Sequence, residues 1–259
     1  MFDAQNADIR IHPLNDIAQV SAGGKAEGLA RLMALGLKVP AGFVITGARP
    51  GCLPEGLEQA YRDLGGGPVA VRSSAADEDG VEASFAGQYE SHLDVQGAEA
   101  LRRAVESCLA SAQSARARAY RARQTGAKSG DVSMAVVVQR MVDARAAGVL
   151  FTADPVSGRR DRMVIDAVRG CGEALVSGQV SPDHLLLDRQ GHVSLCELEG
   201  GAAVLDEGEV EELWRGARQA EEGQGRPLDL EWAIDRVGEI YWLQARPITT
   251  PLADPAEFD

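Results

Sequence analysis

Polar and apolar residues alternate most clearly in two runs near the end of the sequence, within residues 228–249. Such alternation is typical of a β-strand with one buried face, because successive side chains point to opposite sides of a sheet. The runs flank Arg236-Val237-Gly238-Glu239, a glycine-containing segment suited to a turn. We therefore predict a β-hairpin in which Arg236 pairs with Glu239 and sets the register.

This register predicts one apolar face and one polar face for the hairpin. The facing pairs are Leu230 and Ala245, Trp232 and Leu243, Ile234 and Tyr241 on the apolar side, with Glu231 and Gln244, and Asp229 and Arg246, on the polar side. Facing side chains lie about 5 Å apart, so the polar pairs could share one ligand. Carboxylate and amide oxygens suit a hard cation such as Mg²⁺, and an arginine suits phosphate. An ordinary hairpin with a solvated ionic face explains the pattern equally well.

Helical and strand patterns follow one another along the rest of the chain. Helices are predicted at residues 26–35, 57–64, 98–124 and 209–222. Short apolar runs predict strands at residues 69–71, 90–95, 134–139, 147–151, 163–167, 184–187 and 193–196. The glycine-containing segment 125–131 is predicted to connect two lobes, at about 1–131 and 132–250, and residues 251–259 are predicted to form a loose acidic tail.

Two further segments contain residues suited to an anion. Gly23-Gly24-Lys25 precedes the first long helix, where free N–H groups and the helix dipole favour phosphate. The strand at 69–71 delivers Arg72 at its end, and the loop around Phe85 is rich in small residues, so its backbone could lie over a ligand. Without a complete Walker pattern, a solvated lysine and a polar surface loop remain the alternatives.

Composition limits the choice of function. The 259 residues have a net charge of −13, which argues against a nucleic-acid partner because its phosphates would be repelled. No segment resembles a signal peptide or approaches the length of a membrane span, so we expect a cytoplasmic protein without a membrane partner. The four cysteines include no CxxC pair, which predicts reduced and mostly buried thiols.

Six sequence stretches, in a fixed order, indicate which family of proteins the chain resembles. They are GGKAEGLARLMALGLKVPAGFVIT, VAVRSSAADEDGVEASFAGQYESHLDV, VVVQRMV, GVLFTADPVSG, GCGEALVSGQVSPDHLLL and LDLEWAID followed by IYWLQARPIT. In these stretches the chain resembles the N-terminal ATP-binding domain shared by phosphoenolpyruvate synthase, pyruvate phosphate dikinase and rifampin phosphotransferase. The resemblance covers about residues 21–249, nearly the whole chain, and implies an ATP-grasp fold of two α+β lobes that hold ATP between them.

The resemblance also implies roles for individual residues. Lys25 and Arg72 would hold the phosphates, Gly87 and Ser91 would belong to the loop that covers them, and Gln139 would lie on the strand beside the adenine. Glu231 and Gln244 would bind Mg²⁺, and Arg246 would stabilise the transferring phosphoryl groups, so that the catalytic set is Arg246, Arg72 and Lys25. Phosphoryl transfer suits such a set, since it requires mainly positioning and charge neutralisation from the protein.

Two departures from the family pattern matter. Full-length relatives continue into a phosphohistidine domain with a Thr-Cys-His motif, whereas this sequence stops soon after Thr250, and its four histidines match no such motif. The segment between Thr46 and Arg72 is shorter than in the larger dikinases, so one wall of the ATP site could be trimmed.

We therefore expect a Mg²⁺- and ATP-dependent phosphotransferase of the dikinase type. It would pass the β,γ-phosphoryl groups of ATP to a histidine on a separate chain or a missing domain, and release AMP. One alternative is a self-sufficient small-molecule kinase that uses the same site, and another is a noncatalytic nucleotide-binding subunit. The presence of all five charged and amide residues named for phosphate and metal argues against the noncatalytic alternative.

Overall fold

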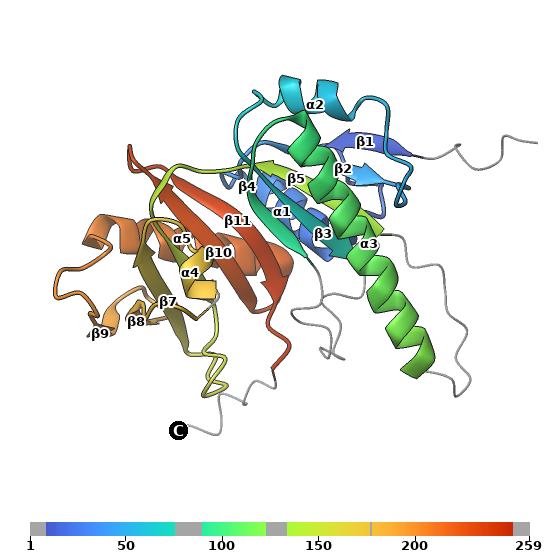
Figure 1. Ribbon diagram of the computed structural model, residues 1–259. Helices are drawn as coiled ribbons and strands as arrows, with labels where there is room; N and C mark the ends of the chain where they lie inside the picture. Colours follow the sequence, from blue (N-terminus) through green and yellow to red (C-terminus); the bar gives the residue numbers. More distant parts are fainter. Residues whose placement is uncertain (1–8, 76–89, 123–133, 177, 251–259) are drawn as a thin grey trace, which may run out of the picture. The chain divides into compact units, whose positions relative to one another are not determined.

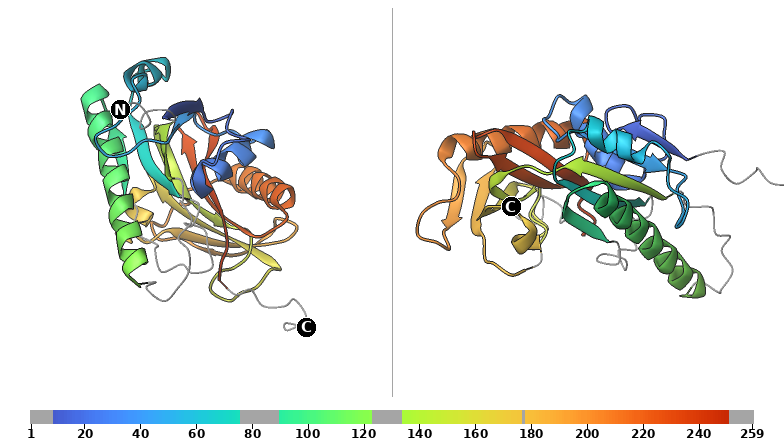
Figure 2. Two further views of the ribbon diagram at one scale, coloured as in Figure 1. Left: turned by 90° about the vertical axis from the view of Figure 1, so that its right-hand side faces the viewer. Right: turned by 45° about the horizontal axis from the view of Figure 1, so that its top comes forward.

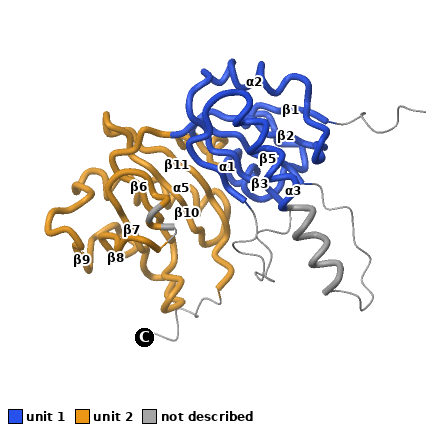
Figure 3. The backbone as a smooth tube through the Cα atoms, viewed as in Figure 1, with its two compact units in different colours: residues 1–30, 40–141 blue, residues 31–39, 142–259 orange. Residues whose placement is uncertain are grey.

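The computed structural model describes residues 9–75, 90–122, 134–176 and 178–250 (Figure 1). The chain divides into two compact units (Figure 3). Unit 1 contains residues 1–30 and 40–141, and unit 2 contains residues 31–39 and 142–259. The sequence prediction set the lobe boundary at about residue 131, and the contacts divide the chain ten residues later, after Met141. Within the described residues, no helix is both long enough and apolar enough to cross a membrane.

The described part of unit 1 contains a five-stranded antiparallel sheet with the order β1-β2-β5-β3-β4. The elements in chain order are β1 (Arg10–Pro13), α1 (Gly23–Ala34), β2 (Gly42–Thr46), α2 (Leu57–Asp63), β3 (Val69–Ala75), β4 (Ser91–Val95), α3 (Ala98–Ala122) and β5 (Met134–Arg140). Helix α1 begins in unit 1, and its residues from Arg31 onward belong to unit 2.

One face of this sheet is apolar because alternate residues of its strands are valine, isoleucine or phenylalanine. These side chains pack with α2 and α3 into one core, which includes Ile45, Val71, Val138, Leu57 and Leu101. Helix α3 supplies its apolar stripe at helical spacing and contacts β3, β4 and β5. The opposite face of the sheet is therefore free to carry polar residues.

The described part of unit 2 contains a six-stranded antiparallel sheet with the order β11-β10-β6-β7-β8-β9. Its elements are β6 (Ala144–Phe151), β7 (Arg162–Arg169), α4 (Glu173–Val176), β8 (Asp183–Asp188), β9 (Val193–Glu197), α5 (Glu207–Gln224), β10 (Leu228–Asp235) and β11 (Ile240–Pro247). Helix α5 runs along one face of this sheet (Figure 2) and closes a second core over β10 and β6.

Both ends of α5 follow from local sequence. Asp206 caps the first turn by accepting from the backbone N–H of Glu209, and the Glu209 side chain accepts from the Asp206 backbone in return. Gly225 ends the helix with φ of +66°, a conformation that favours glycine. The chain then enters β10 within three residues, so α5 determines where β10 begins.

Trp232 and Gly148 form a close contact in the core of unit 2. Trp232 on β10 is completely buried and pairs with Gly148 on β6. A Cβ atom at Gly148 would lie 2.6 Å from the Trp232 ring, and closer still to the backbone oxygen of Asp166. Glycine is therefore required at this position for steric reasons. Although glycine usually weakens a strand, β6 stays regular here because Gly148 pairs with residues of both β10 and β7.

The predicted hairpin is confirmed, but its register is correct only in part. Glu231 pairs with Gln244 and Asp229 with Arg246, as predicted, whereas the pairs Trp232–Leu243 and Ile234–Tyr241 are wrong. A bulge between Glu231 and Trp232 shifts the pairing, so the observed pairs are Trp232–Trp242 and Ile234–Ile240. The reason is burial: the bulge allows Trp242 and Ile240 to enter the core, while Tyr241 and Leu243 stay partly exposed.

Two further expectations are corrected. Strand β3 continues through Arg72 to Ala75, because the buried Ser73 and Ser74 extend the ladder with β5. The four cysteines are free, yet Cys171 and Cys196 are exposed, the latter on the edge strand β9. Only Cys108 is buried as predicted, and burial, assisted by the negative charge of Glu90, raises the pKa of its thiol to about 12.

We predict that Gly148→Ala destabilises the protein by about 1–3 kcal/mol, because the added methyl group has no space between Asp166 and Trp232. Urea unfolding would measure the change. Gly200→Ala in the same unit is the control, since a Cβ there meets no atom of the described residues within 4 Å and should leave the midpoint unchanged. Equal midpoints for the two variants would contradict the packing described.

Candidate functional site

Three of the residues predicted in unit 1 lie on the sheet face opposite α2 and α3. Arg72 on β3 pairs with Ser91, the first residue of β4. Gln139 on β5 pairs with Ala70, which is two residues before Arg72. Paired residues, and residues two apart on a strand, point to the same side of a sheet. Arg72, Ser91 and Gln139 therefore share one face, as a common ligand would require.

The start of α1 lies against this same face. The backbone N–H of Ala26 donates to Ser74 Oγ at 3.2 Å, and Ser74 is two residues beyond Arg72. Gly23 has φ of +80°, and a Cβ there would lie 2.5 Å from the backbone of Ser74. This close approach requires glycine and brings the first turn of α1, with Lys25, to the strand that carries Arg72. The N–H groups of such a turn are suited to an anion.

Gln139 is buried, with 2% of its surface exposed, and its Nε2 has no hydrogen-bond partner among the described residues. A buried amide without a partner is costly, so a ligand that accepts from it would gain affinity. The predicted position of Gln139 beside an adenine ring is compatible with this unsatisfied donor. Gly87, the other residue predicted for unit 1, lies outside the described residues.

In unit 2 the hairpin carries the predicted metal and phosphate residues on the sheet face opposite α5. Glu231 and Gln244 form a directly facing pair, and Gln244 is 5% exposed. Arg246 lies two residues further along β11 and donates from Nε to Asp229 Oδ2 at 2.8 Å. The side chain of Arg246 is half exposed, whereas that of Asp229 is largely buried. Asp229 therefore holds the guanidinium at this face of the sheet.

The donor set of the facing pair fits a hard divalent cation. Glu231 contributes carboxylate oxygens and Gln244 an amide oxygen, and magnesium in proteins is commonly bound by one or two such side chains together with waters and phosphate. Among the described residues, no group of three or more histidine, cysteine, aspartate or glutamate side chains is arranged to hold a metal. The donors of this pair therefore fit the sequence prediction of a magnesium site, which stays a prediction.

The sequence interpretation did not single out two further polar residues on this face. The register runs from Glu231 through Val149 on β6 and Asp166 on β7 to His184 on β8. His184 Nδ1 lies 2.6 Å from Asp166 Oδ1, and both side chains are partly exposed. Asp166 interrupts the apolar run of β7, and His184 directly precedes the apolar run of β8. These two polar residues could have been recognised as neighbours only if the pairing of β7 with β8 had been known.

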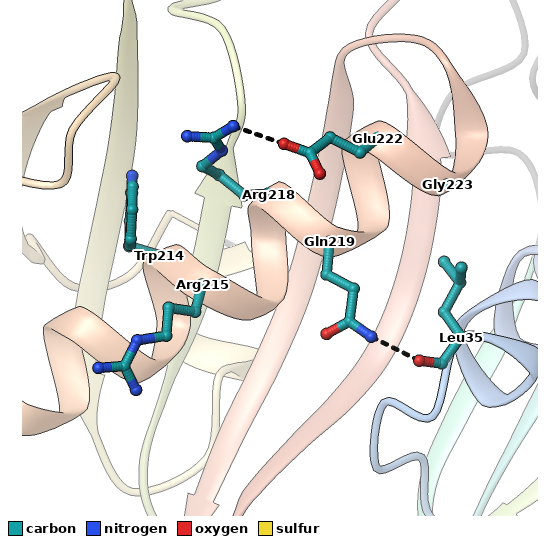
Figure 4. A pocket seen from close by; sticks show the side chains of 7 residues that line it. All are labelled: Leu35, Trp214, Arg215, Arg218, Gln219, Glu222 and Gly223. Atoms are coloured by element: carbon teal, nitrogen blue, oxygen red, sulfur yellow. Dashed lines mark hydrogen bonds and ion pairs between the residues drawn. The ribbon is translucent and has the colours of Figure 1, made fainter.

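A separate hollow lies along α5 (Figure 4) and contains none of the predicted site residues. It is lined by Leu35, Trp214, Arg215, Arg218, Gln219, Glu222 and Gly223. Its polar groups bind one another: Arg218 pairs with Glu222, and Gln219 Nε2 donates to the Leu35 carbonyl at 2.6 Å. These contacts stabilise the helix surface and leave the hairpin face as the candidate functional site of unit 2.

We predict that Gln139→Met raises the free energy of unfolding of the ligand-free protein by about 1 kcal/mol, because it removes a buried donor that has no partner in the described part of the chain. Thermal unfolding without ligand would measure the effect. Gln219→Met is the matched control, since its amide already has a partner and no gain is expected. A loss of stability in Gln139→Met would show that the amide is satisfied in the native protein.

Comparisons with known proteins identify the family of the chain. The family model described as pyruvate phosphate dikinase, AMP/ATP-binding domain matches residues 48–202 and 188–257. The chain is 39% identical over 284 residues to the prodigiosin synthesizing transferase PigC of Serratia marcescens, covering 88% of this chain and 31% of the relative. It is 43% identical over 213 residues to a rifampicin phosphotransferase of a Streptomyces species, covering 73% and 24%.

A probable phosphoenolpyruvate synthase of Methanocaldococcus jannaschii is 40% identical over 206 residues, covering 70% of this chain and 17% of the relative. The chain thus spans less than a third of the length of these relatives. Among solved structures, the protein PH1788 from Pyrococcus horikoshii aligns with a TM-score of 0.51 at 14% identity, covering 90% of this chain and 92% of that one. The predicted α+β fold of the ATP-grasp class is confirmed, and the chain belongs to the pyruvate phosphate dikinase AMP/ATP-binding domain family.

Proposed function

We propose that this chain is the ATP-dependent phosphotransferase module of a dikinase-type enzyme. It binds ATP with Mg²⁺ and passes the β,γ-phosphoryl groups to a histidine outside the residues of this sequence, so that AMP is released. The observation that carries the proposal is the facing pair of Glu231 and Gln244, with Arg246 held by Asp229 on the same sheet face. The names of the phosphotransferase relatives support the same reaction class.

Unit 1 would bind the nucleotide itself. Lys25 and Arg72 supply positive charge beside the first turn of α1, whose backbone N–H groups suit the phosphates. Ser91 lies next to Arg72 and supplies a hydroxyl and a backbone N–H. The buried amide of Gln139 would donate to the adenine, which satisfies a donor that has no partner among the described residues of the ligand-free protein.

Glu231 and Gln244 would hold the magnesium ion through one carboxylate and one amide oxygen. When bound, the ion neutralises phosphate charge that the acidic chain, with a net charge of −13, would otherwise repel. The amide is uncharged, so the pair contributes only one negative charge to the ion. More of the ion's positive charge therefore remains for the phosphates than two carboxylates would leave.

Arg246 would act on the groups that are transferred. The bond between the β-phosphorus and the oxygen bridging it to the α-phosphate breaks, a bond from β-phosphorus to an imidazole nitrogen forms, and AMP takes the bridging oxygen. Negative charge spreads over the phosphoryl oxygens during this step. Because Asp229 already orients the guanidinium, little rearrangement is needed for Arg246 to stabilise that charge.

An acceptor histidine outside this sequence is supported by the sequence context of the four histidines within it. None of His12, His92, His184 and His192 lies in a Thr-Cys-His motif. The relatives are more than three times longer than the matched region, which leaves room for a phosphohistidine domain elsewhere in such enzymes.

A second candidate is direct phosphorylation of a small molecule, and the Asp166–His184 pair is the observation that favours it. A histidine oriented by a carboxylate can accept a proton from a hydroxyl acceptor. The strand register, however, separates Glu231 from His184 by three strand spacings, about 14 Å. This separation makes direct proton transfer at the phosphate less favourable than the dikinase proposal.

The nucleotide product distinguishes these two functions. We predict that the isolated chain turns over ATP very slowly, and that a separately expressed phosphohistidine domain of a relative makes it release AMP. Chromatographic separation of AMP from ADP, with the acceptor domain checked for an acid-labile phosphoryl group, measures this. Rapid ADP formation by the isolated chain with a small hydroxyl acceptor would support direct kinase activity and contradict the dikinase proposal.

We also predict that Arg246→Lys retains most of the affinity for ATP but lowers the rate of AMP formation by roughly 10²–10³. Lysine keeps the charge but loses the planar, bidentate donor geometry of the guanidinium. Calorimetry of nucleotide binding and single-turnover kinetics separate the two effects. Lys25→Ala is the comparison, because it should weaken binding itself. A transfer rate equal to that of the unmodified protein would exclude a catalytic role for Arg246.

A further inference from the structure

Thr152 closes a hydrogen-bond network beside the first residue of β10. Its backbone N–H donates to the Leu228 carbonyl at 2.9 Å, and its hydroxyl accepts from the Leu228 N–H at 2.9 Å. The same hydroxyl donates to Glu221 Oε1 on α5 at 2.9 Å. Thr152 is completely buried, so none of these bonds can be replaced by solvent.

Arg189 completes the network from the turn between β8 and β9. It donates from Nη1 to the Thr152 carbonyl at 2.9 Å and forms an ion pair with the second carboxylate oxygen of Glu221. The turn is held in place by Asp188, which accepts from the backbone N–H groups of Gln190 and His192. Glu221, Arg189 and Thr152 thus connect the end of β6, the last turns of α5 and the start of β10.

This network fixes the backbone of β10 close to the candidate metal site. Leu228 directly precedes Asp229, which holds Arg246, and lies three residues before Glu231. The hydroxyl bond fixes Leu228 at the strand end where β10 enters between β6 and β11. Because side chains alternate along a strand, a displacement here would turn the carboxylates of Asp229 and Glu231 away from their face.

We propose that Thr152, supported by Glu221 and Arg189, is a positioning residue for the metal-binding carboxylate Glu231. This inference rests on the proposed function of the hairpin as the Mg²⁺-binding element. The hydroxyl is the required group because it accepts from Leu228 and donates to Glu221 at the same time. Serine can make both bonds, whereas valine has the same shape as threonine but can make neither.

The test measures binding of a nonhydrolysable ATP analogue with Mn²⁺ as the metal, and again in EDTA. Binding in EDTA depends on unit 1 and should be the same in all variants. Thr152→Val should weaken Mn²⁺-dependent binding about tenfold, in the range typical for loss of groups that orient metal ligands. Thr152→Ser should restore it. The electron paramagnetic resonance spectrum of bound Mn²⁺ should change in Thr152→Val only.

Asp183→Asn is the matched control for a purely structural effect. Asp183 is buried in the same unit and accepts from the backbone N–H groups of Glu199 and Val204, far along the sheet from β10. Its loss should lower the melting temperature without changing Mn²⁺-dependent binding. If Thr152→Val fails to fold, Glu221→Gln replaces it, since an amide keeps an acceptor for Thr152 but loses the ion pair with Arg189.

Two outcomes would overturn the inference while the proposed function stands. One is Mn²⁺-dependent affinity in Thr152→Val equal to that of the unmodified protein. The other is an equal loss in EDTA and in Mn²⁺, which would make Thr152 a structural residue only. An unmodified protein that gains no nucleotide affinity from Mn²⁺ would overturn the proposed function and this inference together, so the two failures are distinguishable.

Discussion

Strand β10 is hydrogen-bonded on both sides, to β6 and to β11, and its register with them determines which sheet face carries Asp229 and Glu231. The face toward α5 receives Leu228, Leu230 and Trp232, which are completely buried. A shift by one residue would place two carboxylates in that core and expose the tryptophan, at a large cost in free energy. The hydrophobic core therefore enforces the position of the charged residues on the opposite face.

In unit 1, too, burial of one face of the sheet orients the polar residues on the other face. Its sheet buries one face against α2 and α3, and the other face carries Arg72, Ser91 and Gln139. Here the additional constraint is the close approach of Gly23 to Ser74, which brings the start of α1 to the strand of Arg72. In both units, then, burial of one sheet face orients the functional residues on the other.

Several features of the fold and site could be predicted from the sequence because they depend on neighbouring residues only. Alternation within residues 228–249 was sufficient to pair Glu231 with Gln244 and Asp229 with Arg246, and the structure confirms both pairs. The bulge after Glu231 could not be predicted in this way. It arises because Trp242 and Ile240 gain more from burial than Leu243 and Tyr241, and that gain depends on the space that Gly216 of α5 leaves for Trp242.

Helix and strand periodicity and the six ordered stretches are local properties, so the sequence was sufficient to predict most helices and strands and their order, although β1 was not among them. The sequence also named Lys25, Arg72, Gln139, Glu231, Gln244 and Arg246. The tertiary structure was needed to show that Arg72, Ser91 and Gln139 share a face, and it added residues with no local signal. Thr152, Arg189 and Glu221 are separated by up to 69 positions and meet only because β6, the β8–β9 turn and α5 pack around the start of β10. Such contacts depend on the packing of segments that are distant in the sequence, so they cannot be predicted from the periodicity of polar and apolar residues.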